Sequence, residues 1–135
     1  MTLPTPAIDV ATTLNTAAVA VLGTSLFACP ELPQSDRIPA QCIFVIPSGG
    51  PPNDDFLGDA PHGINHSRVQ VVVRAAPFDM QSGETLARNV WDALHHATIN
   101  GWMECKCSQG FPVYFGLNDQ QQPRWSVNLE MMRQV

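Results

Sequence analysis

Two stretches of the chain alternate between apolar and polar residues, and this alternation constrains the fold more than any other feature. In residues 67–75 the apolar positions are Val69, Val71 and Val73, and the polar ones are Arg68, Gln70 and Arg74. In residues 124–132 the apolar positions are Trp125, Val127, Leu129 and Met131. Successive side chains of a β-strand point to opposite faces of its sheet. Each stretch therefore predicts a strand with one face on the core and the other against water or a partner.

A first helix is predicted over residues 9–22, with Asp9 as its candidate N-cap and Gly23 as its stop. The apolar residues at helical spacing are Ile8, Ala11, Leu14, Ala18 and Leu22. No charged residue follows Asp9 until Glu31. A helix face exposed to water normally carries Lys and Glu, so this uncharged face indicates packing against another subunit. Its candidate interface residues are Thr12, Asn15 and Thr16.

A second helix is predicted after a turn over residues 77–83, in which Asp79 and Ser82 are candidate caps. The helix is expected to end at Asn100-Gly101, because Asn and Gly favour the backbone conformation that closes a helix. The residues predicted to face the core are Leu86, Val90, Ala93, Leu94 and Ala97.

Three further strands complete the predicted fold, and residues 118–123 form a hairpin-like connection before the last strand. These strands are expected at residues 40–46, 102–107 and 113–117. The chain of 135 residues has the usual size of one domain, here predicted as residues 1–135. The fold class is therefore α+β, with two helices packed on one mostly antiparallel sheet of about five strands in the order α-β-β-α-β-β-β.

A long acidic loop is predicted over residues 47–66, which are rich in Gly and Pro and contain no Lys or Arg. Loops of this length inside a small domain are uncommon and are usually functional or mobile. We expect this one to project from the body of the domain. Its acidic residues are Asp54, Asp55 and Asp59.

The charge balance excludes some functions. The chain has 7 Lys and Arg against 12 Asp and Glu, a formal charge of −5, which argues against a dedicated nucleic-acid binder or a binder of anionic membranes. No apolar run approaches the roughly 18 residues that a membrane-spanning helix needs. We expect no membrane partner.

No arrangement of residues predicts a catalytic, cofactor or metal site. His95, His96, Cys105 and Cys107 are the best candidates for a zinc site, but adjacent helical residues point about 100° apart. Cys-x-Cys on a strand also lacks the loop that lets two thiolates wrap a metal. Exposed helix histidines and reduced core cysteines are the favoured interpretation, so no enzyme and no cofactor are predicted. A small enzyme or ligand-binding domain that uses these residues remains the alternative.

Taken in order, several short motifs resemble the minor capsid or tail terminator proteins of long-tailed bacteriophages and gene transfer agents. The resemblance extends over most of the chain from about Asp9. The motifs are Leu22-Gly23, Leu26-Phe27, Gly49-Gly50, the run Arg68 to Arg74, the helix piece Trp91 to His95, and a tail with Pro112, Tyr114, Gly116, Asp119, Pro123, Arg124, Trp125, Ser126, Asn128 and Leu129.

This resemblance implies a structural virion protein that is assembled in the host cytoplasm. Such a protein forms a ring, typically a hexamer, at the head-proximal end of the tail tube. The implied partners are further copies of the chain, the major tail tube protein and a head-tail connector or stopper protein, with double-stranded DNA passing through the ring without sequence-specific binding. Another neck component, such as a connector or stopper, is the alternative function.

In such a ring, two groups of residues are expected to make contacts or to line the channel. Arg68, Gln70 and Arg74 are expected at a subunit seam, where they would pair with acids of the adjacent copy; a sheet face exposed to water is the competing interpretation. Asp54, Asp55 and Asp59 are expected at the lumen of the ring or at its contact with the tail tube.

Overall fold

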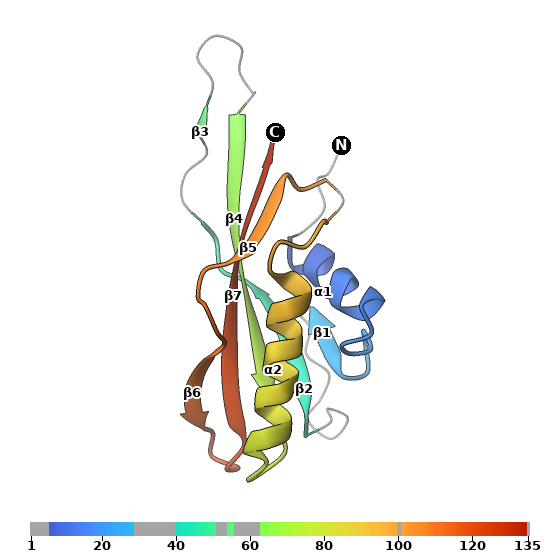
Figure 1. Ribbon diagram of the computed structural model, residues 1–135, viewed down its shortest axis with the longest axis vertical. Coiled ribbons are helices and arrows are strands. Elements are labelled where there is room, and N and C mark those ends of the chain that lie inside the picture. Colours follow the sequence, from blue (N-terminus) through green and yellow to red (C-terminus); the bar gives the residue numbers. More distant parts are fainter. Residues whose placement is uncertain (1–5, 29–39, 51–53, 56–62, 100, 135) are drawn as a thin grey trace.

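One seven-stranded sheet with two helices on a single face forms the body of the protein (Figure 1). The structure is a computed structural model that describes residues 6–28, 40–50, 54–55, 63–99 and 101–134. The predicted α+β class and mostly antiparallel sheet are confirmed. The elements in chain order are α1 (Pro6–Thr16), β1 (Leu26–Ala28), β2 (Cys42–Pro47), β3 (Asp54–Asp55), β4 (Gly63–Arg74), α2 (Met80–Leu94), β5 (Glu104–Cys107), β6 (Val113–Leu117) and β7 (Pro123–Gln134).

The long antiparallel pair of β4 and β7 is the centre of the sheet, and its register runs from Ile64 opposite Gln134 to Arg74 opposite Arg124. The strand order is β1-β2-β4-β7-β5, with β3 beside β4 and β6 beside β7. All pairs are antiparallel except β1 with β2. Because β4 occupies one side of β7, β5 and β6 share the other side, one after the other.

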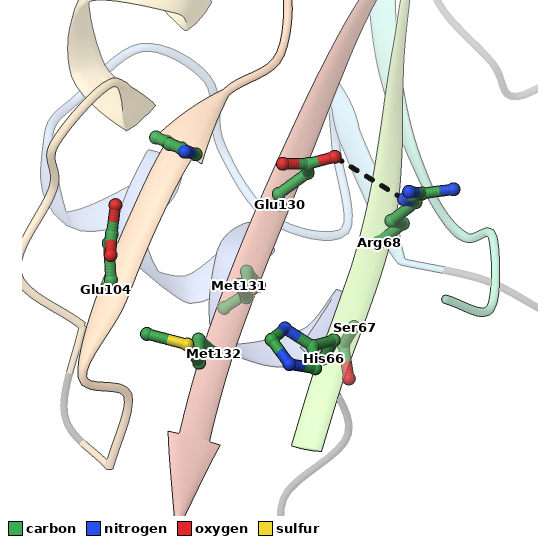
Figure 2. Close-up of a pocket in the computed structure, with 8 residues that line it drawn as sticks. His66, Ser67, Arg68, Glu104, Glu130, Met131 and Met132 are labelled. Atoms are coloured by element: carbon green, nitrogen blue, oxygen red, sulfur yellow. Dashed lines mark ion pairs between the residues drawn. The ribbon is translucent and has the colours of Figure 1, made fainter. Parts of the chain in front are cut away.

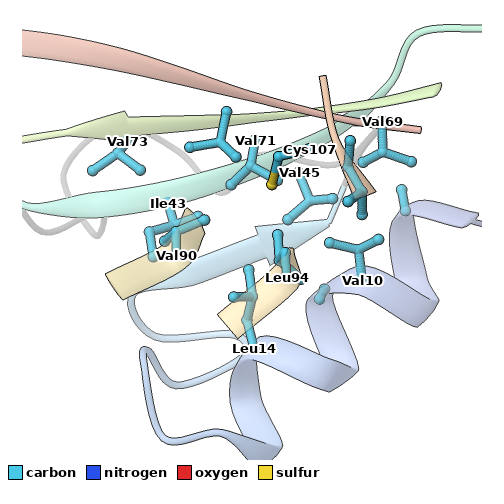
Figure 3. Close-up of a cluster of buried hydrophobic side chains, with 14 of the residues drawn as sticks. Val10, Leu14, Ile43, Val45, Val69, Val71, Val73, Val90, Leu94 and Cys107 are labelled. Atoms are coloured by element: carbon cyan, nitrogen blue, oxygen red, sulfur yellow. The ribbon is translucent and has the colours of Figure 1, made fainter. Parts of the chain in front are cut away.

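The core lies between this sheet and the two helices (Figure 3). The predicted alternation is confirmed, since the side chains of Val69, Val71 and Val73 have no exposed surface. Leu14 of α1 and Leu94 of α2 pack against them in the same buried cluster. Burying a side chain of this size stabilises the fold by about 1.5–3 kcal/mol relative to leaving it exposed.

Helix α1 differs from its prediction at both ends. It begins at Pro6, so Asp9 lies inside the first turn and is not the N-cap. It ends at Thr16, because Ala18 takes a left-handed backbone conformation (φ 60°) and the Asn15 side chain accepts the Leu22 N–H at 3.1 Å. The earlier start also shifts the buried stripe, which consists of Ala7, Val10, Ala11 and Leu14. Of the predicted stripe, Ile8, Ala18 and Leu22 are exposed.

Helix α2 confirms Asp79 as the N-cap, with its side chain accepting the Ser82 N–H at 3.2 Å. Ser82 itself lies inside the helix, so the predicted turn over 77–83 extends too far. The helix ends at Leu94, where His95 takes an extended backbone, and the predicted end at Asn100-Gly101 is wrong. Asn100 lies outside the described residues. Ala97 packs against the core from the segment after the helix.

The strands differ from their predictions mainly in length. β6 has the predicted bounds, β5 begins at Glu104, and β7 extends to Gln134. The structure adds the short strands β1 and β3, and it begins β4 at Gly63. Three parts of the predicted loop over 47–66 are therefore strand: Pro47 at the end of β2, β3, and residues 63–66 of β4. Its residues 51–53 and 56–62 lie outside the described residues.

Cysteines 42, 105 and 107 are free, buried thiols, as predicted; Cys29 lies outside the described residues. None of the helices in the described part of the chain is long and apolar enough to cross a membrane.

Candidate functional site

The sheet face away from the helices, here called the outer face, carries a row of charges. Arg68 on β4 forms an ion pair with Glu130 on β7 at 3.5 Å (Figure 2). Lys106 on β5 lies opposite Glu130 in the register, so cations stand on both sides of this carboxylate. The row borders a shallow depression of about 270 Å³. Both members of the ion pair are about half exposed, which limits its contribution to stability to about 0–1 kcal/mol.

The other two residues predicted at a subunit seam lie on the same outer face. Gln70 donates a hydrogen bond from Nε2 to the Ser126 hydroxyl at 3.0 Å. Arg74 donates from Nε to the Ala40 carbonyl at 3.2 Å, and its guanidinium lies 5.5 Å from the centre of the Phe44 ring. Arg68, Gln70 and Arg74 therefore each have a partner within the chain, and their pairing with a neighbouring copy stays a prediction.

The uncharged face of α1 is present and exposed. Thr12, Asn15 and Thr16 all lie on the outside of the helix. A groove of about 480 Å³ runs between this helix and the segment after α2, with Asp9, Thr12 and Thr16 on one side and Ile99 on the other. The sequence prediction thus identified a real surface with a hollow in it.

A second apolar surface was missed by the sequence analysis. It consists of the following residues, here called the β6 strip: Phe111, Val113, Tyr114, Phe115 and Leu117. Each of them exposes between 41% and 68% of its surface. Within the described residues β6 pairs with β7 alone, so its other edge is open. The absence of any charged residue between Lys106 and Asp119 was a signal that could have found this surface.

Arginines lie over two aromatic rings of the β6 strip. The Arg124 guanidinium is 4.7 Å from the centre of the Phe115 ring, and that of Arg88 is 5.6 Å from the centre of the Phe111 ring. Phe78 lies beside the β6–β7 turn, where its N–H donates to the Gln121 carbonyl at 3.1 Å. Phe78 is 78% exposed. Clustered exposed aromatic residues of this kind mark interaction surfaces.

Asp54 and Asp55 of the predicted loop lie at the other end of the sheet from β6. Asp54 and Asp55 form β3, which pairs with Gly63 and Ile64 at the start of β4. The residues of β7 that pair with β6 lie opposite the far end of β4. Asp59 lies outside the described residues.

The chemistry of the His and Cys residues does not favour a reactive site. Burial, together with the nearby carboxylates of Glu104 and Asp9, raises the pKa of Cys105 to about 11. Burial raises the pKa of Cys107 to about 12. Both thiols therefore stay protonated at neutral pH, whereas nucleophiles and metal ligands need the thiolate.

The histidines also differ from their prediction, because both follow the end of α2 and His95 is half-buried. Its Nδ1 accepts the Cys107 N–H at 3.2 Å, and its ring stacks on Trp91 with centres 4.4 Å apart. The part of the chain that the structure describes has no group of three or more His, Cys, Asp or Glu that could hold a metal ion.

Comparison with known families identifies the chain. The model of the bacteriophage tail terminator protein family matches residues 14–135. The chain belongs to this tail terminator family. No curated protein matches the sequence.

A solved structure has the same fold as this tail terminator family member. It is a chain in the virion of a native gene transfer agent particle, with a TM-score of 0.64 and 15% sequence identity. The match covers 93% of this chain and 92% of that one. The resemblance predicted from the sequence is confirmed. The protein is a structural component of the phage tail, located in the virion.

Proposed function

We propose that this protein forms a closed ring at the head-proximal end of the tail tube. There it ends polymerisation of the tube protein and joins the tail to a connector or stopper protein of the head. The single observation that carries this proposal is the match of the tail terminator family to residues 14–135. We further propose that residues 1–135 act as one domain, that the ring is a hexamer and that the protein has no enzymatic activity.

Exposed surfaces on opposite sides of the fold support a ring. A closed ring of identical subunits joins two different patches of each copy. The uncharged α1 face, with Thr12, Asn15 and Thr16, supplies one patch. On the outer face we place Arg68, Gln70 and Arg74 at the subunit seam. Their partners within the chain are exchangeable, because an exposed ion pair such as Arg68–Glu130 contributes little to stability.

The charge of the protein suits a channel for DNA. Each copy carries a formal charge of −5, so six copies carry −30. A negative lumen repels phosphate, and the duplex then passes through without being held. We propose that Asp54, Asp55 and Asp59 face this lumen or the tail tube. Their negative charge, with no Lys or Arg in residues 47–66, supports that role.

Polymerisation of the tail tube protein in the presence of purified terminator tests this function. We expect the mean tube length to fall as the terminator concentration rises, with extra density at one tube end in electron micrographs. Tubes of unchanged length and bare ends at saturating protein would refute the proposal. Binding to DNA-filled heads without binding to tubes would instead favour a connector or stopper.

A further inference from the structure

The edge strands β1 and β6 lie at the same position along the strand direction of the sheet. In the strand registers Leu26 of β1 lies opposite Ile43, Ile43 opposite Val73, Val73 opposite Trp125, and Trp125 opposite Tyr114 of β6. One row of residues thus crosses five strands from β1 to β6. The β6 strip and the β1 side are therefore opposite ends of the same row.

The edge at β6 is short and its pairing with β7 is irregular between Tyr114 and Leu117, but it lacks the other features that keep sheet edges apart in soluble proteins. Proteins protect exposed edges with charged residues, prolines or covering segments. β6 has no charged residue and no proline, and its large side chains are exposed. Exposed apolar side chains gathered at one edge favour an interaction surface.

The edge at β1 carries a second uncharged surface, formed by α1 and the turn that follows it. Val21 and Leu22 on this turn are 58% and 42% exposed. The bond between the Asn15 side chain and the Leu22 N–H ties the turn to the exposed face of α1. No charged residue occurs between Asp9 and Glu31, just as none occurs between Lys106 and Asp119. The charges nearest the two surfaces are opposite in sign: Asp9 lines the groove beside α1, and Arg88 lies over the Phe111 ring of the β6 strip.

We propose that the β6 strip of one copy packs against the α1 face and the Val21-Leu22 turn of the next copy. This inference rests on the proposed ring, and it adds the β6 strip to the side of the seam on which Arg68, Gln70 and Arg74 are proposed. A second copy is the occupant because this chain carries, on opposite edges, two exposed surfaces whose own side chains are uncharged and whose bordering charges, Arg88 and Asp9, are opposite in sign. The shared row places the two patches at the same position along the strands. A contact between two different patches of identical copies is the kind that generates a ring when its rotation closes.

The contact is made by side chains and not by an added strand. The backbone groups of Leu26 that point away from β2 are already bonded: its N–H donates to the Val21 carbonyl, and its carbonyl accepts the Gly23 N–H. Phe111 is the most exposed member of the β6 strip and the natural anchor for the groove beside Thr12 and Thr16. Buried aromatic anchors in pockets carry much of the binding energy of protein interfaces.

The test places one aspartate on either surface. Phe111→Asp removes the aromatic anchor of the β6 strip. Val21→Asp disables the opposite edge, because a charge buried without a partner is costly. Met103→Asp is the matched control, since Met103 is 62% exposed and lies directly before β5, beside Met132 at the other end of β7 from β6. Native mass spectrometry and electron microscopy on tube ends measure ring formation, and circular dichroism checks that each variant is folded.

We expect each of the two variants to lose ring formation at least tenfold, while Met103→Asp forms rings like the original protein. In a mixture, the intact β6 strip of Val21→Asp meets the intact α1 side of Phe111→Asp. The mixture therefore yields pairs that grow no further. Rings formed equally well by both variants would overturn this inference and leave the proposed function intact. An original protein that forms no ring, either in solution or on tube ends, would overturn the proposed function itself.

Discussion

Replacing Gly83 by alanine tests the packing of α2 on the sheet. A Cβ at this position would lie 2.6 Å from the Ala75 Cβ and 2.7 Å from Cη2 of Trp125, whereas carbon atoms in contact are about 3.5–4.0 Å apart. Neither neighbouring group can easily move away from the added Cβ. The Ala75 Cβ is attached directly to the backbone, and the Trp125 ring is 4% exposed and packs against Tyr114 with ring centres 5.4 Å apart.

The expected cost follows from two opposing effects. Overpacking a core costs about 1–3 kcal/mol, and the rigid neighbours place this site at the upper end. Alanine gains about 1 kcal/mol over glycine inside a helix. We therefore expect Gly83→Ala to lower the free energy of unfolding by about 2 kcal/mol.

Urea denaturation followed by circular dichroism measures this change. Gly110→Ala is the matched control, because a Cβ there meets nothing within 4 Å, and its stability should equal or slightly exceed that of the original protein. A Gly83→Ala variant as stable as the original protein would refute the close packing of α2 on Trp125.

Three further predictions concern a cap, the buried thiols and the outer face. Asp79→Ala should lower the free energy of unfolding by about 1 kcal/mol, as measured by urea denaturation, because the first turn of α2 loses its cap. Cys105 and Cys107 stay protonated in the folded protein above pH 9 while unfolded thiols ionise, so each thiol should lower stability by about 1 kcal/mol per pH unit from pH 9 towards 11. Urea titrations from pH 8 to 11 should show a shallower decline when both are replaced by alanine, and parallel curves would contradict the assignment. A double-mutant cycle with Arg68→Gln and Glu130→Gln should give a coupling below about 1 kcal/mol that shrinks with added salt; a larger, salt-independent coupling would show that the pair is not exposed.

The sheet could be predicted where the sequence carries a period of two. Val69, Val71 and Val73 are buried because alternation assigns them to one face, and the same rule identified the inner face of β7. The strands β1 and β3 are too short to show a period. The end of α1 depends on the Asn15 side chain bond and the backbone of Ala18, which leave no apolar pattern in the sequence.

The candidate site was predictable only in part, and for a related reason. The uncharged face of α1 could be identified because missing charges are visible in a sequence. The bounds of β6 were also predicted, but its exposure was not, because a sequence shows a strand without showing that its outer edge is unpaired. Arg68 was correctly placed on the outer face, whereas its partner Glu130 became apparent only from the register of β4 and β7.

A reconstruction of the finished particle around the junction of head and tail tests the central claim most directly. The account predicts a single ring of this chain between the last layer of the tail tube and the head, with its β6 edges against the α1 edges of neighbouring copies. Density for the chain elsewhere in the particle, or a junction formed without it, would contradict the account.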